Sequence, residues 1–104
     1  MKEVILTEAH NGGRVSAAIG DILIVRLPEN PTTGFRWTFQ VTNNLTQTVD
    51  NFVTTAADIG AGGQRCLQFS VQSIGVGRIE AVLRRDWETG IAPQSVFSVS
   101  IDIH

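Results

Sequence analysis

Cysteine and charge are both scarce in this chain. The one cysteine, Cys66, excludes an internal disulfide but leaves the redox compartment open. Charged residues make up 17% of the sequence, below the roughly 25% usual for globular domains. No apolar run approaches the roughly 18 to 20 residues of a membrane span, and a basic-then-apolar signal peptide is missing. We expect no membrane association, and a protein that is cytoplasmic or, after removal of a leader, secreted, periplasmic or vesicular.

Apolar residues that favour helices are also few. Of 104 residues, 14 are Ala or Leu, whereas 31 are Val, Ile or Thr. Because β-branched residues favour strands, this composition excludes a helix bundle. The length suits one domain, and no repeat or linker interrupts it. We therefore expect a single all-β domain over residues 1–104.

Few residues could perform catalysis or bind a ligand of high charge. Positive charge is scattered and the net charge is −2, which argues against nucleic acid as a partner. Only His10 and His104 could act as a base for Cys66, and Asp102 with His104 offers two metal ligands where structural zinc needs four. We expect no enzyme, no cofactor, no metal and a monomer.

Eight short stretches have the composition of strands and are bounded by turn-forming residues. They cover residues 3–7, 14–19, 21–27, 35–42, 46–57 with a break, 64–72, 76–85 and 95–103. Several alternate apolar and polar residues, as a strand with one buried face does. The expected inward residues are Phe35, Trp37, Phe39, Val41, Leu67, Phe69, Val71, Ile79, Ala81, Leu83, Phe97, Val99, Ile101 and Ile103.

Half-buried strands need a second layer, and too little helix is available to supply it. The sequence therefore predicts an immunoglobulin-like antiparallel β-sandwich of about eight strands with a core tryptophan, Trp37, and no disulfide. If consecutive strands run antiparallel, every second connection lies at the same end. Segments 28–34, 58–63 and 86–94 should then cluster there.

The first of these segments combines Pro31, two β-branched threonines and Gly34. Proline fixes φ, threonine is stiff at χ1, and glycine permits a positive φ on return to the strand. A preorganised binding loop and an ordinary turn explain this composition equally well.

The other two segments are glycine-rich and tryptophan-bearing. Gly60 to Gly63 lacks the following Lys-Ser/Thr and helix of a phosphate loop, so it is either a flexible hairpin tip or a place where the backbone comes very close to a partner surface. Trp87 falls outside the inward periodicity that ends at Leu83. It is either an exposed binding anchor or a ring folded over the end of the sandwich.

Together, the three segments resemble in order and spacing the signature loops of the chagasin-like inhibitors of papain-family cysteine peptidases. The resemblance covers nearly the whole chain, but Asp86 stands where the family usually has proline. It implies an immunoglobulin-like fold and a reversible, non-covalent inhibitor that inserts three adjacent loops into the cleft of cathepsin-type enzymes. The implied protease-binding residues are Asn30, Pro31, Thr32, Thr33, Gly34, Phe35, Gly60, Ala61, Gly62, Gly63, Arg85, Asp86 and Trp87.

The resemblance also implies a role for each loop. Thr32 and Thr33 would cover the catalytic Cys-His pair, the glycine loop would lie along the unprimed side, and Trp87 would stack on the primed side. Arg85 would brace the loop or contact the enzyme. The alternative function is an immunoglobulin-like binding or adhesion module that uses the same loops on a receptor or glycan.

Overall fold

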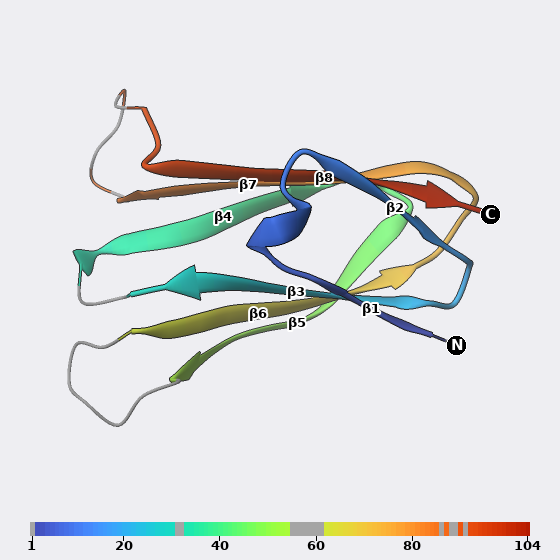
Figure 1. The fold of residues 1–104 in the computed structure, drawn as a ribbon, viewed down its shortest axis with the longest axis horizontal. Coiled ribbons are helices and arrows are strands. Elements are labelled where there is room, and N and C mark those ends of the chain that lie inside the picture. The colour runs from blue at the N-terminus through green and yellow to red at the C-terminus, as the bar shows by residue number, and fades with distance from the viewer. Residues whose placement is uncertain (1, 31–32, 55–61, 86, 88–89, 91) are drawn as a thin grey trace.

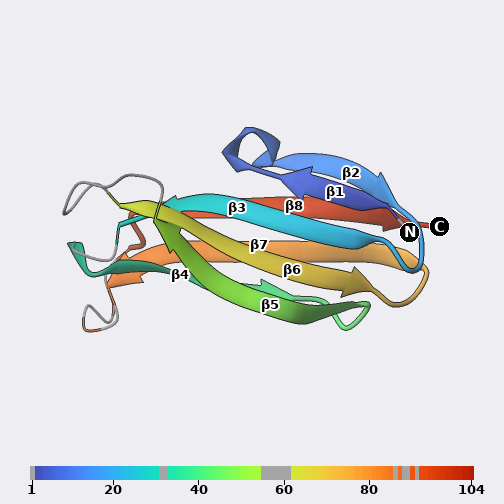
Figure 2. The ribbon, with the colours of Figure 1, turned by 90° about the horizontal axis from the view of Figure 1, so that it is seen from below.

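The computed structural model describes residues 2–30, 33–54, 62–85, 87, 90 and 92–104. It contains eight strands arranged as two four-stranded sheets that face one another (Figures 1 and 2). The predicted β-sandwich is therefore confirmed. Within the described ranges, no helix has the length and apolar character needed to cross a membrane.

The order of strands in the first sheet is β1-β3-β6-β5 and in the second β2-β8-β7-β4. The 3₁₀ turn η1 (Glu8–His10) joins β1 to β2. The strand bounds are β1 Glu3–Leu6, β2 Gly13–Ala17, β3 Ile22–Glu29, β4 Phe35–Val41, β5 Leu45–Thr54, β6 Gly63–Val71, β7 Gly75–Arg85 and β8 Ser95–Ile103. These bounds lie close to the predicted ones. The predicted break in the fifth strand is an irregularity between Gln47 and Val49, and residues 55–57 lie outside the described ranges.

Two strand pairs differ from a purely antiparallel arrangement. β1 pairs with β3, and β2 with β8, in parallel register, whereas the other four pairs are antiparallel. The cause is the connection through η1, which takes the chain from one sheet to the other instead of turning it back as a hairpin. Alternation of apolar residues identifies a strand and its buried face, but carries no information about its direction.

The core fills the space between the sheets with most of the residues that the alternation places inward, whereas Phe35 is half-buried and lies outside the core cluster. Leu67, Phe69 and Val71 of β6 face Ile79 and Ala81 of β7, and all five are at most 3% exposed. The expected core tryptophan, Trp37, is 5% exposed. The apolar faces of both sheets are thus removed from water, which is the main source of stability in such a fold.

Asp21 stabilises the end of the sandwich where the β2–β3 connection lies. Its carboxylate accepts hydrogen bonds from the backbone N–H groups of Ala18 (2.9 Å) and Lys2 (3.0 Å). These bonds, above all the one from Ala18, hold the pKa of Asp21 below its ordinary value. The ionised carboxylate therefore joins β1 to the turn that precedes β3.

Acid should destabilise the protein partly through Asp21. Because the pKa of Asp21 is lower in the folded state, its contribution to stability is complete above the ordinary pKa of 3.8 and is lost as pH falls through the lowered value. We expect Asp21→Asn to lower the thermal midpoint at neutral pH and to flatten its decline in acid. Thermal unfolding followed by circular dichroism across this pH range tests both effects. An acid decline as steep as that of the parent would contradict the assignment.

Candidate functional site

The described parts of the three unusual segments meet at one end of the sandwich, on the left of Figure 1. Register places Phe35 beside Arg85 and Glu29 beside Gly63. A hollow of about 430 Å³ lies between the segments. The residues that line it are Pro28, Glu29, Asn30, Thr33, Phe35, Gly62, Gly63, Leu83, Arg85 and Gln94. The predicted clustering is confirmed for the described residues of segments 28–34, 58–63 and 86–94, whereas Pro31, Thr32, Gly60, Ala61 and Asp86 lie outside the described ranges.

The first segment closes on itself through Asn30 and Thr33. The Asn30 carbonyl accepts hydrogen bonds from both the backbone N–H (3.2 Å) and the hydroxyl (2.8 Å) of Thr33. The next residue, Gly34, has a φ of +81°, in the region that glycine favours. Its expected conformational role is confirmed, and the segment is held by its own hydrogen bonds before any partner arrives.

Gly34 is also the contact point between the first and third segments. A Cβ on this residue would overlap the ring atom Cη2 of Trp87, so only glycine allows the indole to lie this close. The Trp87 side chain nevertheless remains 69% exposed. Of the two interpretations of Trp87, the structure supports an exposed ring whose edge rests on the neighbouring loop.

Arg85 stabilises the contact between Gly34 and Trp87. Its Nε donates a hydrogen bond to the Thr33 carbonyl (3.0 Å). Its guanidinium carbon lies 4.3 Å from the centre of the Phe35 ring and 5.8 Å from that of Trp87. A cation over two aromatic faces, fixed by a hydrogen bond, restrains both segments at once. The bracing role implied for Arg85 therefore has a structural basis.

The glycine segment packs against the first one through Gly62. This residue has a φ of +79°, and a Cβ on it would lie 3.2 Å from the Cβ of Asn30. Gly63 is paired on both sides, with Glu29 and with Thr54. The described end of the glycine segment therefore lies close to the first segment, whereas the expected approach to a partner surface stays a prediction.

A buried ionic network beneath the loops was not predicted. The Glu29 carboxylate is 3% exposed, and its Oε2 accepts hydrogen bonds from the Trp37 backbone N–H (2.8 Å) and from Nη1 of Arg65 (3.0 Å). The same Nη1 donates to the Trp37 carbonyl (3.3 Å). Arg65 also binds Asp50, with Nη2 2.8 Å from Oδ2. The hydrogen bonds that Arg65 donates to Asp50 lower the pKa of Asp50 and raise that of Arg65.

This network ties the first sheet to the free edge of β4 in the second sheet. Glu29 ends β3, and Trp37 lies near the start of β4, so the network secures both ends of the first segment. A second bond, from Nε1 of Trp37 to the Pro28 carbonyl (2.8 Å), acts between the same strands. One feature of the sequence could have indicated the network. Arg65 lies two residues before Leu67 and four before Phe69, so it shares their inward face of β6.

Comparison with known proteins agrees with this geometry. Residues 16–101 match the model of the family described as chagasin family peptidase inhibitor I42. The chain belongs to the chagasin family. Chagasin of Trypanosoma cruzi is 34% identical to it over 89 residues, which cover 79% of this chain and 81% of the relative.

Two solved structures share the fold of this chagasin-family chain. The cysteine protease inhibitor EhICP2 of Entamoeba histolytica superposes with a TM-score of 0.88 at 23% identity, covering 100% of this chain and 97% of the other. PbICP-C, solved in complex with falcipain-2, gives a TM-score of 0.61 at 14% identity and covers 97% and 87%. At these identities the likeness concerns the fold, and it extends over nearly the whole domain.

The residues weighed for catalysis or metal binding have local roles in this chagasin-family chain. His10 accepts a hydrogen bond at Nδ1 from the Thr7 backbone N–H (3.0 Å) and so closes the η1 turn. Asp102 is bound by Arg14 at 2.7 Å. Cys66 is half-buried in β6. Among the described ranges, no three His, Cys, Asp or Glu residues are grouped so as to hold a metal ion.

The network of Glu29, Arg65 and Asp50 should contribute far more to the free energy of unfolding than an exposed ion pair does. Glu29→Ala would leave the Trp37 N–H without its acceptor and Nη1 of Arg65 with the Trp37 carbonyl alone, while Asp50 still balances the Arg65 charge. The expected cost is about 2 kcal/mol or more. The matched control is Glu80→Ala, which removes the partner of Arg78 in a half-exposed pair on β7 and should cost less than about 1 kcal/mol. Urea unfolding measures both. Similar losses in the two variants would show that the network is dispensable.

Proposed function

We propose that this chain is a reversible, non-covalent inhibitor of papain-like cysteine proteases, which its three adjacent loops enter at the active-site cleft. The observation that carries the proposal is the convergence of the three segments into one braced surface, in a chain of a peptidase inhibitor family. Two structural relatives agree with the target class, since EhICP2 is described as a cysteine protease inhibitor and PbICP-C was solved with falcipain-2.

The first loop would block the catalytic centre. In the proposed complex, Thr32 and Thr33 stand over the catalytic Cys-His pair, and Pro31 hinders attack on the chain. The hydrogen bonds between Thr33 and Asn30, and that from Arg85, fix the described part of this loop in the free protein. Because these described residues are already held in place, less entropy is lost there on binding, which favours high affinity.

The two flanking loops would bind the protease on either side of its catalytic centre. Gly60 to Gly63 would offer backbone hydrogen bonds along the unprimed side, where side chains would obstruct close approach. Trp87 would stack on an aromatic surface of the primed side, and its exposure leaves a large rigid face for that contact. Arg85 acts mainly as a brace between the loops, since its Nε is already bonded to Thr33.

The alternative, a binding or adhesion module, uses the same surface without inhibition. It would explain the exposed tryptophan and the sandwich. Membership in a peptidase inhibitor family favours inhibition over adhesion. It also accords with the expectation that the chain is not an enzyme.

Trp87 should contribute strongly to inhibition. We expect Trp87→Ala to raise the inhibition constant against papain at least tenfold, about 1.4 kcal/mol, because a hot-spot residue is lost. The matched control is Ile74→Ala, since Ile74 is 71% exposed and lies in the β6–β7 connection at the other end of the sandwich. Papain activity, titrated with each variant, gives the constants, and circular dichroism confirms the fold.

The outcomes separate the two functions. If the parent inhibits and the Trp87 variant alone weakens, the loop end is the inhibitory surface. If the parent has no effect on papain or on cathepsin-type enzymes, the adhesion module becomes the better account. Equal weakening by both variants would exclude a special role for Trp87.

Inhibition should not depend on the thiol of Cys66. This residue lies within β6, paired with Arg26 and Asn51 and away from the loop tips. Cys66→Ser should therefore leave the inhibition constant within about twofold, since no covalent bond to the enzyme is needed, and dilution should restore protease activity. A folded Cys66→Ser protein that no longer inhibits would establish a thiol-mediated mechanism instead.

A further inference from the structure

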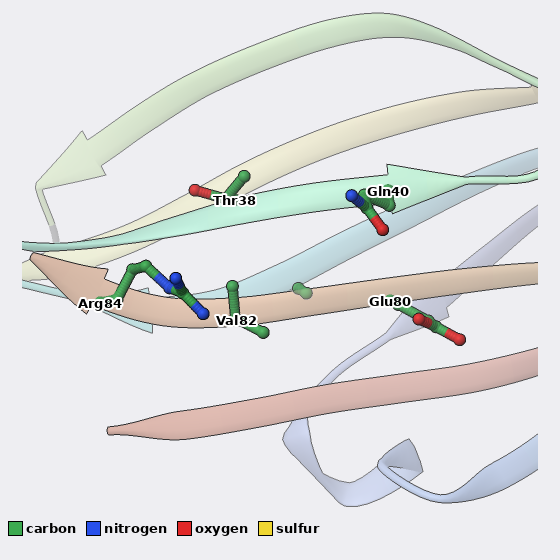
Figure 3. Close-up of a pocket in the computed structure, with 6 residues that line it drawn as sticks. Thr38, Gln40, Glu80, Val82 and Arg84 are labelled. Atoms are coloured by element: carbon green, nitrogen blue, oxygen red, sulfur yellow. The ribbon is translucent and has the colours of Figure 1, made fainter. Parts of the chain in front are cut away.

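A second hollow, of about 360 Å³, lies on the outer face of β4 and β7. Thr38 and Gln40 line it from β4, and Val82 and Arg84 from β7 (Figure 3). The Arg84 side chain runs back along β7 towards Val82, over the face turned away from the core. The proposed function leaves this feature without a role.

Two arginines stand directly opposite one another beside the hollow. Register pairs Arg36 of β4 with Arg84 of β7. Their neighbours Trp37 and Leu83 face the core, so both arginines project from the outer face. Like charges at opposed positions repel and destabilise a sheet. An anion bound between the two guanidinium groups would offset this repulsion and so stabilise the pair.

Two carboxylates of the described ranges near this face are already bound by other arginines. Asp50 is bound through both oxygens by Arg65, and Glu80, at the far side of the hollow, is bound by Arg78. Arg36 acts on Asp50 only as a charge at a distance, and it lowers the pKa of Asp50 less than Arg65 does.

Arg84 retains an unused donor. Its Nε is buried and has no hydrogen-bond partner anywhere in the described part of the chain. A buried donor without a partner costs free energy until an acceptor reaches it.

The position of the pair suggests which molecule supplies that acceptor. The next pair along the same ladder is Phe35 with Arg85, both of which belong to the candidate protease-binding loops. One step along a strand is about 3.3 Å. The arginine pair is therefore continuous with the proposed inhibitory surface, and a protease seated on the loops would have its rim beside this face.

We propose that Arg36 and Arg84 form an exosite for a carboxylate side chain on the rim of the target protease, outside the catalytic cleft. The inference rests on the proposed function. The planar guanidinium of Arg84 can bind a carboxylate through two parallel hydrogen bonds, and the Thr38 hydroxyl lies on the same side of the sheet as a further donor. The exosite speeds association and selects proteases with an acidic rim.

Association kinetics test the exosite with Arg36→Gln/Arg84→Gln. The matched control is Arg14→Gln/Arg26→Gln, which removes the same charge from exposed arginines of β2 and β3. Stopped-flow inhibition of papain and of a cathepsin-type protease with an acidic rim gives the rate constants. At about 0.01 M salt we expect association with the acidic-rimmed enzyme to slow at least threefold beyond the control, and the difference to vanish near 1 M salt, where charges are screened.

Binding of a carboxylate to the free protein can be measured directly. Tetraglutamate titrated into the free protein should shift the Nε–H resonance of Arg84 saturably, whereas tetraglutamine should not, and Arg26 should respond little to either. Arg84→Lys, which keeps the charge and loses the planar fork, should bind the acidic-rimmed protease with faster dissociation than the parent.

The results distinguish the exosite from the proposed function. Inhibition by the parent tests the function alone, whereas the variants are compared with the parent and the control. Rates equal to those of the control for every protease, or equal shifts at Arg84 and Arg26, would overturn the exosite even if the parent inhibits. If the parent fails to inhibit, a selective tetraglutamate shift would still identify a carboxylate site, and its absence would remove that site as well.

Discussion

The loop end of the sandwich depends on the ion pair between Glu29 and Arg65. A hydrophobic core holds two sheets together but is non-directional, so it restrains their sliding only weakly. The pair adds direction, because its carboxylate and guanidinium bind the N–H and the carbonyl of one residue, Trp37, across the sheets. Asp50 completes the arrangement on the other side of Arg65. In a fold without a disulfide, this network fixes how far apart the adjoining ends of β3 and β4 stand, and so sets the distance that the connection between them must span.

Much of the fold could be predicted because a strand repeats with period two. The alternation in β6 and β8 predicted their buried residues, including Phe69 and Phe97. Direction and partner could not be predicted, since β1 and β2 carry the same local pattern whether their neighbours run parallel or antiparallel. Those properties depend on a cross-over between sheets at η1, a turn whose hydrogen bond to His10 has no strong signature in the sequence.

The candidate site was predictable as a set of segments but not as a set of contacts. Stiff and flexible residues identified the loops, and the parity of the connections placed them at one end. The overlap that keeps residue 34 a glycine arises from Trp87, more than fifty positions away, and the burial of Glu29 depends on Arg65 in another strand. Such pairings between distant residues are set by the assembled sheets. A charged residue at an inward position, such as Arg65, was the one local indication.

The two chain ends lie at the end of the sandwich opposite the loops (Figure 1). His104 donates its backbone N–H to Ala17, and Lys2 accepts one from Ile22, so both ends are joined to the sheets there. With a longest dimension of 42 Å, the domain separates its points of attachment from its working surface by most of its own length. A tether, a fused partner or a solid support joined at either end would therefore leave the three loops pointing outward, so that the domain can act as an inhibitory head on a larger assembly.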